Sequence, residues 1–586
     1  MKFPKFPLFS RRALTAAASV SVAAFAAATA VEAGTIRHDY ALTLYKDFAT
    51  NSGMFAAGAT NVQYYHTNGS AGGTIAVMPN LSGFLYYHGR AGGYSSAAGI
   101  TASGGNGGAG LIAPQYFASA FHVGIPTSGA TITFFPGTGK AINSYVGAGY
   151  DEHGYDQILV RLDKIVTETT YNPLATDSAF IRSLSSGSVD VYRLGTGQPF
   201  VAGENGGLTL LHQDSIPIGG VARITNVNEN FKWTGNNRIV MRLNKGDSNM
   251  LGTAAEGGDS GSPLYAYNAA TRRFEYVGTT STAAAQVGYF GNYTNFEYNP
   301  SAYLRSMAAF DSDHVSVADA GGVISWDGAN LSRGDETWDY HGLTNGCTTN
   351  VETRGIVFDN AGAGTQEICL AQAIDLGAGS VTVNSGSFLL SSDVAGTTSF
   401  KSAGFIVNAG ATLTTTFSGA AGTEWRKVGE GDLVIQGSGN HEIALNVGGG
   451  VQQFDENLNQ LYLGEVRLDR EGGYAAKTIR LSAGVAKIVL MRDGQIKGAS
   501  SFTFGIGGGL LNLNGQNLSW NVINHTDSGA KFGNFKLDDA TEAPADSTFT
   551  YTGSGTFKGG FIDGNGELSS YDSETQSWNR GGVMET

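Results

Sequence analysis

Residues 256–265 read EGGDSGSPLY and permit two interpretations. Glycine, aspartate, serine and proline are common in surface turns, so the stretch is compatible with an ordinary loop. The same residues are typical of the loop that presents a nucleophilic serine, which would place Ser260 in the reactive position. Because the four letters GDSG do not separate these interpretations, the decision depends on the rest of the chain.

A nucleophilic Ser260 needs three kinds of partner. These are a base within hydrogen-bond reach, an acidic group that orients the base, and backbone N–H groups that stabilise the oxyanion of the tetrahedral intermediate. Glycines before the serine let the backbone turn its N–H groups toward one point, so we expect the amides of Gly258 and Ser260 to form the oxyanion hole. Asp259 is expected to lie behind the serine as a structural anion.

His122 is the candidate base. The chain has ten histidines, and their spacing alone does not rank them. His122 stands out because it ends the segment LIAPQYFASAFHVG, in which small residues follow an apolar run. A strand that leads into a turn of small residues presents an imidazole at the edge of a core, where its pKa and tautomer can be set.

Two aspartates compete for the role of the orienting acid. In DEHGYDQILVRLDK, a strand through QILVRL puts Asp156 at its start and Asp163 at its far end. Asp163 is followed by Lys164, and a surface ion pair explains that arrangement simply. The residues alone leave both aspartates open.

The composition bounds the class of protein. A length of 586 residues predicts two or more domains. The net charge of −14, from 50 acidic and 36 basic residues, argues against a nucleic-acid partner. Glycine occurs 85 times, about twice its usual share, which suits short strands joined by tight turns. Plentiful aromatic and branched aliphatic residues exclude a disordered chain.

The first 33 residues are typical of a secretory signal peptide. Four positive charges in MKFPKFPLFSRR precede a small, apolar, alanine-rich run, and Val31 and Ala33 stand at the cleavage positions. We therefore expect a mature chain that begins at Gly34 and is exported to the periplasm, the cell surface or the medium. No later stretch is long and apolar enough to span a bilayer as a helix.

The texture of the chain changes near residue 310. Before it, apolar runs such as GGTIAVM alternate with long irregular loops, and one short helix is expected over residues 41–49. After it, segments such as GEVRLDR and KTIRLSAG alternate apolar and polar residues and are punctuated by Gly, Asn or Asp. This texture favours the stacked coils of a parallel β-helix, with a β-sandwich as the alternative.

The two cysteines, Cys347 and Cys369, are expected to form a disulfide. Export makes a disulfide permissible, and the loop between the two residues is short. A metal site with only two cysteines lacks further ligands, so we expect no metal.

Several segments together resemble the IgA-protease-like group of serine protease autotransporters from Gram-negative bacteria. The mature start, GTIRHDYALTLYKDF, is similar to the N-terminal signature of that family. LIAPQYFASAFHVG is similar to its histidine motif, DQILVRLDKIVTE to its aspartate motif and GGDSGSPLYAYNAATRRFEYVGT to its serine motif. Residues 424–450 and 505–534 are similar to recurrent segments of its β-helix stalk.

The resemblance implies a fold and a set of roles. The fold is all-β: a signal peptide over 1–33, a chymotrypsin-like double β-barrel over 34–309, and a right-handed parallel β-helix over 310–586. In the aspartate motif the catalytic carboxylate lies five residues before an arginine, and Arg161 therefore selects Asp156 over Asp163. Ser260 would be the nucleophile, with His122 as base and then acid. The implied reaction is cleavage of extracellular proteins through an acyl-enzyme, without a cofactor.

The resemblance also places a specificity pocket. Its base would be Ala254, six residues before Ser260, and one wall would be formed by Gly278, Thr279 and Thr280. Without an acid at this base, a preference for Arg or Lys is not expected, although Glu256 is close enough to enter the pocket. Small or apolar side chains are the expected substrates.

Two features depart from the family pattern. Family members continue through a longer stalk into a C-terminal outer-membrane β-barrel, whereas this sequence ends at Thr586 without barrel strands. We expect a fragment, a truncated gene or another export route. Gly34 also begins GTIR rather than the Ile-Val-Gly-Gly start of many zymogens, so the sequence does not tell which cation neutralises Asp259.

Two other functions compete with the protease. A catalytically inactive β-helical adhesin or surface structural protein would keep this fold, but it has no need of a complete set of His122, Asp156 and Ser260. A secreted β-helical polysaccharide lyase or hydrolase would gather charged residues on one face of the solenoid. The charges in segments such as RLDREGG are scattered instead.

Overall fold

A computed structural model gives the fold of most of the chain. The described residues are 34–87, 94–96, 107–123, 131–134, 137–144, 156–202, 208–212, 215–228, 237–242, 250–255, 258–284, 293–311, 313–339, 354–525, 533–536, 547–553, 560–562, 568–572 and 577–579. The predicted signal peptide lies outside them. Within these ranges, no helix combines the length and the apolar character that crossing a membrane would need.

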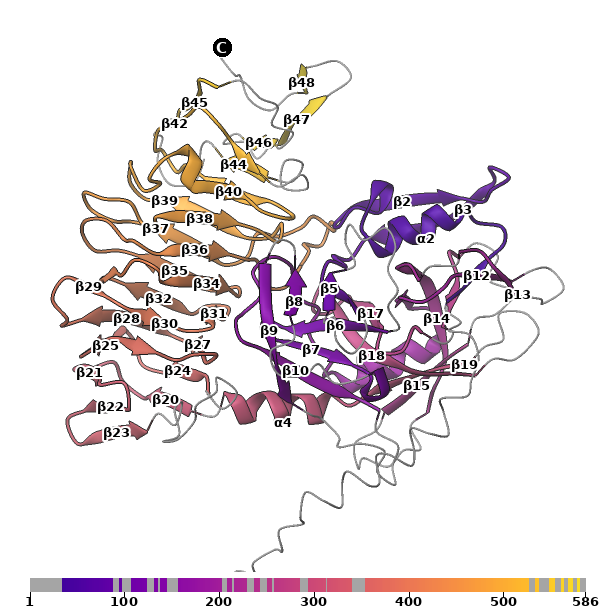
Figure 1. Ribbon diagram of the computed structural model, residues 1–586, viewed down its shortest axis with the longest axis horizontal. Helices are drawn as coiled ribbons and strands as arrows, with labels where there is room; N and C mark the ends of the chain where they lie inside the picture. Colours follow the sequence, from indigo (N-terminus) through magenta and orange to yellow (C-terminus); the bar gives the residue numbers. More distant parts are fainter. Residues whose placement is uncertain are drawn as a thin grey trace, which may run out of the picture.

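The first half forms two closed β-barrels that lie side by side (Figure 1). The first barrel consists of β4 (Phe84–Tyr87), β5 (Tyr94–Ser96), β6 (Gly108–Ala113), β7 (Tyr116–Ser119), β8 (Thr131–Phe134), β9 (Gly137–Ser144) and β10 (Ile158–Leu162). The second consists of β11 (Asp190–Gly195), β14 (Ile218–Asn228), β15 (Asn237–Arg242), β17 (Pro263–Asn268), β18 (Arg273–Ala284) and β19 (Tyr293–Tyr298). Closure leaves neither sheet with an open edge.

A third, smaller sheet brings the start of the described chain to the second barrel. Its order is β13 (Leu208–Leu210), β12 (Phe200–Ala202), β1 (Thr35–Arg37) and β16 (Thr253–Ala254). A separate hairpin, β2 (Thr60–Tyr65) with β3 (Ala71–Val77), completes this end. The expected helix over 41–49 is confirmed as α2 (Leu42–Ala49), which buries Tyr45 and Phe48. Two further helices are α3 (Ser178–Ser183) and α4 (Pro300–Phe310), and α4 leads from the barrels to the second half.

The second half is a parallel β-helix. One sheet stacks β20 (Asp313–Val317), β24 (Ile356–Asn360), β27 (Ser380–Ser385), β31 (Gly404–Val407), β34 (Glu424–Val428), β36 (Ala444–Val447), β38 (Thr478–Leu481), β40 (Phe502–Phe504) and β43 (Asn524–His525). The other begins with the antiparallel set β23 (Glu336–Asp339), β22 (Asn330–Arg333) and β21 (Val323–Trp326) and ends with β46 (Gly560–Ile562), β47 (Leu568–Asp572) and β48 (Ser577–Asn579). Between them it stacks β25 (Thr365–Leu370), β28 (Ser387–Ser392), β32 (Thr412–Thr415), β35 (Asp432–Ile435), β37 (Glu465–Leu468), β39 (Lys487–Leu490), β41 (Gly509–Asn512) and β44 (Gly533–Lys536).

The alternation seen in the sequence explains the stacking. In strands such as β32, β35 and β37, every second residue is buried, and the apolar side chains of successive coils lie over one another. Leu413, Leu433, Val466 and Ile488 form one such column through parallel pairing. Each coil therefore buries its apolar face only against its neighbours. The double barrel followed by a parallel β-helix is confirmed, and the β-sandwich alternative is wrong.

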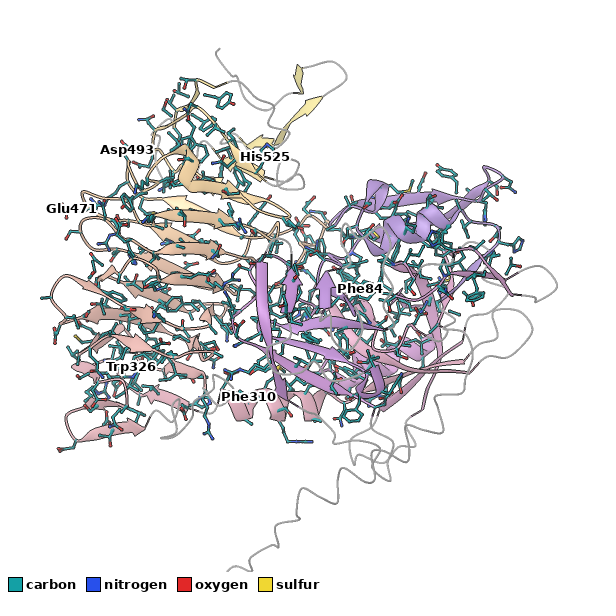
Figure 2. All side chains as sticks on the ribbon, viewed as in Figure 1. Phe84, Phe310, Trp326, Glu471, Asp493 and His525 are labelled. Atoms are coloured by element: carbon teal, nitrogen blue, oxygen red, sulfur yellow. The ribbon has the colours of Figure 1, made fainter. Side chains whose placement is uncertain are left out.

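The β-helix contacts the first barrel directly, as Figure 1 shows. The buried ion pair Arg426–Glu168 joins β34 to the segment after β10, with 3.2 Å between Nη1 and Oε1. Arg161, in β10, donates from Nη2 to the carbonyl of Ala378 at 2.8 Å. Its guanidinium also lies 4.7 Å from the ring centre of Phe310, which Figure 2 labels at the junction of the two halves.

A segment of the β-helix also completes the core of the barrel half. Phe454 is fully buried among the apolar residues of that core and packs against Tyr267 and Phe274. Close by, the side chain of Gln452 accepts a hydrogen bond from the amide of Asn80 at 2.7 Å. The two halves therefore share side chains rather than merely touching at their surfaces.

The predicted disulfide involves one described cysteine and one that lies outside the described residues. Cys369 lies buried in β25, and burial raises the pKa of its thiol. Cys347 lies outside the described residues, so the disulfide between the two stays a prediction.

Candidate active site

His122 is presented at the edge of the first barrel. Strand β7 pairs with β6 and with β10, and the chain then turns through a single 3-10 turn, Phe121–Val123. The small residues Ser119 and Ala120 are fully buried at this turn, whereas the imidazole of His122 is 34% exposed. The apolar run and the small residues thus do what the sequence predicted: they hold the imidazole at the core edge.

Asp156 immediately precedes β10 and is buried. Its Oδ1 accepts a hydrogen bond from the backbone N–H of His122 at 2.9 Å, and its Oδ2 bonds to Nδ1 of the same histidine. Ser281 donates to Oδ2 from its hydroxyl at 3.0 Å. The carboxylate therefore fixes the position of His122 through both backbone and ring. Of the two candidate aspartates, Asp156 is the one that contacts the imidazole.

Ser260 lies on a turn of the second barrel that packs closely against the first. The carbonyl of Ser260 accepts from the amide of Gly108 at 2.8 Å. Gly261 follows at φ +81°, a region where only glycine is unstrained. A Cβ at Gly261 would also lie 2.2 Å from the carbonyl oxygen of Gly108. These glycines allow the serine loop to touch the strand that leads to His122.

The three predicted residues form one chain of hydrogen bonds. Nε2 of His122 lies 2.6 Å from Oγ of Ser260, while Nδ1 is held by Asp156. With the proton on Nδ1, Nε2 is free to accept the hydroxyl proton of the serine. The arrangement can remove a proton from Ser260 and stabilise the imidazolium that results.

Two backbone amides of the serine loop have no protein acceptor among the described residues. Gly258 has φ +94°, again a conformation suited to glycine, and its carbonyl is occupied by the hydroxyl of Thr196 at 2.9 Å. Among the described residues, the N–H groups of Gly258 and Ser260 donate to no protein acceptor. Two free donors beside a serine hydroxyl are what an oxyanion hole requires.

The barrel half of the chain is similar to a known protein family. Residues 33–300 match the family model described as immunoglobulin A1 protease. Over these residues, the chain is similar to that family. The match covers the two barrels and all three residues of the hydrogen-bonded chain.

Similarity to curated proteins extends beyond residue 300 into the β-helix. The serine protease SepA autotransporter of Shigella flexneri is 28% identical over 529 residues, 87% of this chain and 35% of the relative. The serine protease EatA of Escherichia coli O78:H11 is 27% identical over 514 residues, 85% of this chain and 34% of the relative. The chain thus spans about a third of the length of these curated relatives.

A solved structure supports the fold. The Hap adhesin of Haemophilus influenzae superimposes with a TM-score of 0.63 at 19% identity, over 89% of this chain and 55% of that one. The SepA relative is an autotransporter, and autotransporters are exported, which confirms the prediction that this chain is exported.

The predicted specificity pocket stays a prediction. Ala254 is buried in β16, where it pairs with Thr35. Gly278, Thr279 and Thr280 lie in β18, and the carbonyl of Thr280 accepts from the amide of Gly261 at 2.7 Å. The proposed wall is therefore next to the serine loop. Glu256 lies outside the described residues, and within the described part of the chain no group of three or more metal-binding side chains occurs.

Sequence reasoning missed two residues of the candidate site. Ser281 bonds to Asp156, and its only signal was its place directly after the predicted wall in GTTST. Arg193 forms a fully buried ion pair with Asp259 and so supplies the cation that the sequence did not identify. Its signal was an arginine inside the otherwise apolar strand VYRLG.

Proposed function

We propose that this chain is a secreted serine endopeptidase that cleaves extracellular proteins with Ser260 as nucleophile. The observation that carries the proposal is the position of His122, which bonds to Asp156 through Nδ1 and to Ser260 through Nε2. The serine protease relatives support the same reaction class. Cleavage of extracellular proteins is likewise part of this proposal.

The reaction follows from the geometry. His122 takes the hydroxyl proton as Oγ of Ser260 attacks the scissile carbonyl carbon, and the amides of Gly258 and Ser260 stabilise the oxyanion. Collapse of this intermediate breaks the C–N bond, and His122 gives its proton to the leaving amine. A water molecule, deprotonated by His122, then releases the acyl group from Ser260. No cofactor takes part in these steps.

Substrate preference follows from the neutral pocket. Ala254 as its base and Gly278, Thr279 and Thr280 as its wall offer no carboxylate to a basic side chain, so small or apolar side chains are the proposed preference. A library of peptides that vary at the residue before the cleaved bond tests this. Preferred cleavage after Arg or Lys would contradict the proposed pocket without affecting the proposed nucleophile.

A fluorophosphonate probe tests the nucleophile. The full chain, purified after export, is treated with the probe and weighed intact: Oγ forms the O–P bond, fluoride leaves, and His122 takes the proton. One adduct is expected on the native chain and on Ser262→Ala, the other serine of the same loop, and none on Ser260→Ala. An unlabelled but folded native chain would favour the inactive adhesin, which the likeness to the Hap adhesin keeps as the alternative.

A further inference from the structure

Asp259, the residue before the proposed nucleophile, is held by several donors. Its side chain is 0% exposed, as is that of Arg193, whose Nη2 pairs with Oδ2. The amides of Thr196 and Gly197 donate to Oδ1 at 2.8 and 3.2 Å. Arg193 is itself fixed at Nη1 by the hydroxyl of Thr253 at 2.8 Å. A buried carboxylate needs such compensation, because burial of an unpaired charge is very costly.

These donors attach the serine loop to strand β11 and to the turn that follows it. Strand β11 carries Arg193, and the turn after it carries Thr196, whose hydroxyl also bonds to the carbonyl of Gly258. The side chain of Asp259 and the carbonyl of Gly258 are therefore tied to one rigid barrel strand. Since Gly258 and Ser260 flank Asp259, the direction of their free amides depends on this attachment.

A second cation can reach the same carboxylate. Gly34 is buried just before β1, and its carbonyl accepts from the amide of Phe200 at 3.0 Å. A Cβ at Gly34 would lie 3.2 Å from Oδ2 of Asp259 and 3.3 Å from Nη1 of Arg193. Removal of a signal peptide at the predicted site would thus create an α-ammonium group beside Asp259, which already has a guanidinium partner.

We infer that Arg193 is a positioning residue that holds the serine loop in its reactive form, so that the reactivity of Ser260 does not wait for a free amino group at Gly34. This inference rests on the proposed function. A guanidinium is part of the chain before and after processing and keeps its charge at any pH where the protein is folded. An α-amino group exists only after cleavage and loses its charge near pH 8.

The first experiment tests whether the α-ammonium group of Gly34 is needed in addition to the guanidinium of Arg193. It moves the amino group away from Asp259 and then removes its charge by raising the pH. Insertion of Ser-Gly between Ala33 and Gly34 in the full chain moves the processed amino group away from Asp259, and mass spectrometry confirms the new start. The rate of fluorophosphonate labelling is expected to change by less than about 3-fold. For the native chain, this rate is expected to stay level from about pH 8 to about pH 10. A loss of about 10-fold or more, or a decline through the titration of an amine, would overturn the inference.

The second experiment removes the guanidinium. Arg193→Met is expected to lower the labelling rate by about 100-fold or more, comparable with the loss of an oxyanion donor. Arg193→Lys, which keeps a cation, is expected to recover part of that rate. Arg223→Met is the matched control, because Arg223 lies in the same barrel but pairs with Asp190 at the surface, where the two side chains are 39% and 41% exposed. Equal labelling of Arg193→Met and native protein would overturn the inference.

Hydrogen exchange tests the role of Arg193 independently of the proposed protease activity. In Arg193→Met, the backbone amides of residues 258–264 are expected to exchange at least about 10-fold faster than in the native chain, while the β-helix amides keep their rates. If Arg193→Met fails to fold, the same comparison is made with Arg193→Lys. Unchanged exchange in residues 258–264 refutes the role of Arg193 whatever the labelling shows. An unlabelled native chain with the expected exchange refutes the protease instead.

Discussion

The two barrels and the β-helix use short strands in opposite ways. In the barrels, the proposed catalytic side chains come from distant positions: His122 and Ser260 are 138 residues apart and meet where two closed sheets touch. In the β-helix, contacts recur at nearly constant steps: Ser391 bonds to Glu367 across 24 residues, and Trp425 bonds to Phe400 across 25. The barrels thus concentrate chemistry at one point, whereas the β-helix distributes stability over many equivalent coils.

This difference makes the two halves respond differently to substitution. A change in the barrel site alters a single group that no other residue replaces, so activity falls while the fold remains. A change in a coil alters a unit of a column, so stability falls while the reacting groups stay in place. Substitutions in the barrel site should therefore affect activity, and substitutions in the coils should affect stability.

The largest effect is expected at Asp156. Asp156→Asn keeps the size of the side chain but removes the charge that orients His122, so the rate of peptide hydrolysis should fall by about 10⁴-fold. The melting temperature should change little. The control is Asp163→Asn at the other end of β10, whose activity should match the native protein. Similar losses in both variants would refute the assignment of Asp156.

Within the β-helix, the largest effect is expected at Trp425. This side chain is 1% exposed, donates from Nε1 to the carbonyl of Phe400 at 3.0 Å and packs against Phe405 and Phe417. Trp425→Ala should lower the free energy of unfolding by about 3–5 kcal/mol. The labelling rate of Ser260 in the folded fraction should be unchanged.

Val323→Ala provides the comparison for Trp425→Ala. Val323 lies in the same half but is 48% exposed. Its replacement should shift the free energy of unfolding by no more than about 0.5 kcal/mol. If both variants were equally stable in urea denaturation, the coils would not be the source of stability inferred from their packing.

A smaller effect is expected at the junction of the two halves. Arg426→Met leaves Glu168 buried without its cation and should cost about 3 kcal/mol of unfolding free energy. The double variant with Glu168→Gln should recover part of this loss, because no unpaired charge remains. Arg467→Met, which removes an arginine that is 43% exposed, is the control and should be nearly neutral. A loss in the double variant equal to the sum of the single losses would exclude coupling across the junction.

The effect that is smallest at neutral pH is a pH dependence inside the β-helix. Burial, together with the positive charge of Arg470, lowers the pKa of His441 to about 3 from an ordinary value of 6.5. Between these values the unfolded chain binds a proton that the folded chain does not, so stability falls as the pH falls from 6.5 toward about 3. The slope contributed by this one group approaches about 1.4 kcal/mol per pH unit.

His441→Leu removes this contribution. The acid limb of stability against pH, measured by urea denaturation, should be shallower in the variant by about one proton. The carboxylates titrate in both proteins and cancel in the comparison. Parallel acid limbs would show that His441 is protonated in the folded state.

The sequence predicted those features that depend on local pattern. The alternation in strands such as β35 predicts short, half-buried strands and favours a β-helix, but the same two-residue period left a β-sandwich as the alternative. His122 and Ser260 were found because small residues and glycines mark their turns. Asp156 was separated from Asp163 only through Arg161 and a family motif, since the two aspartates flank the same predicted strand and the residues alone left both open.

The residues that were missed act across long stretches of chain. Ser281 reaches Asp156 over 125 residues and Arg193 reaches Asp259 over 66. No local pattern predicts such a pair, because the two partners come together only when strands that are distant in the sequence have packed. The segment around Phe454 has the sequence of an ordinary loop, GGGVQQFDENLN, and its burial depends on a core formed by other residues.

Phe454 has a consequence for the order in which the protein matures. Residues near it contact the barrel half across long distances in the chain, as between Gln452 and Asn80, which are separated by 372 residues. A chain made from its N-terminus has synthesised both barrels long before this segment exists. Until then the barrel core lacks the ring that packs on Tyr267 and Phe274. The β-helix therefore acts as the last part of the assembly: a complete barrel core belongs only to a chain whose first coils have already been made.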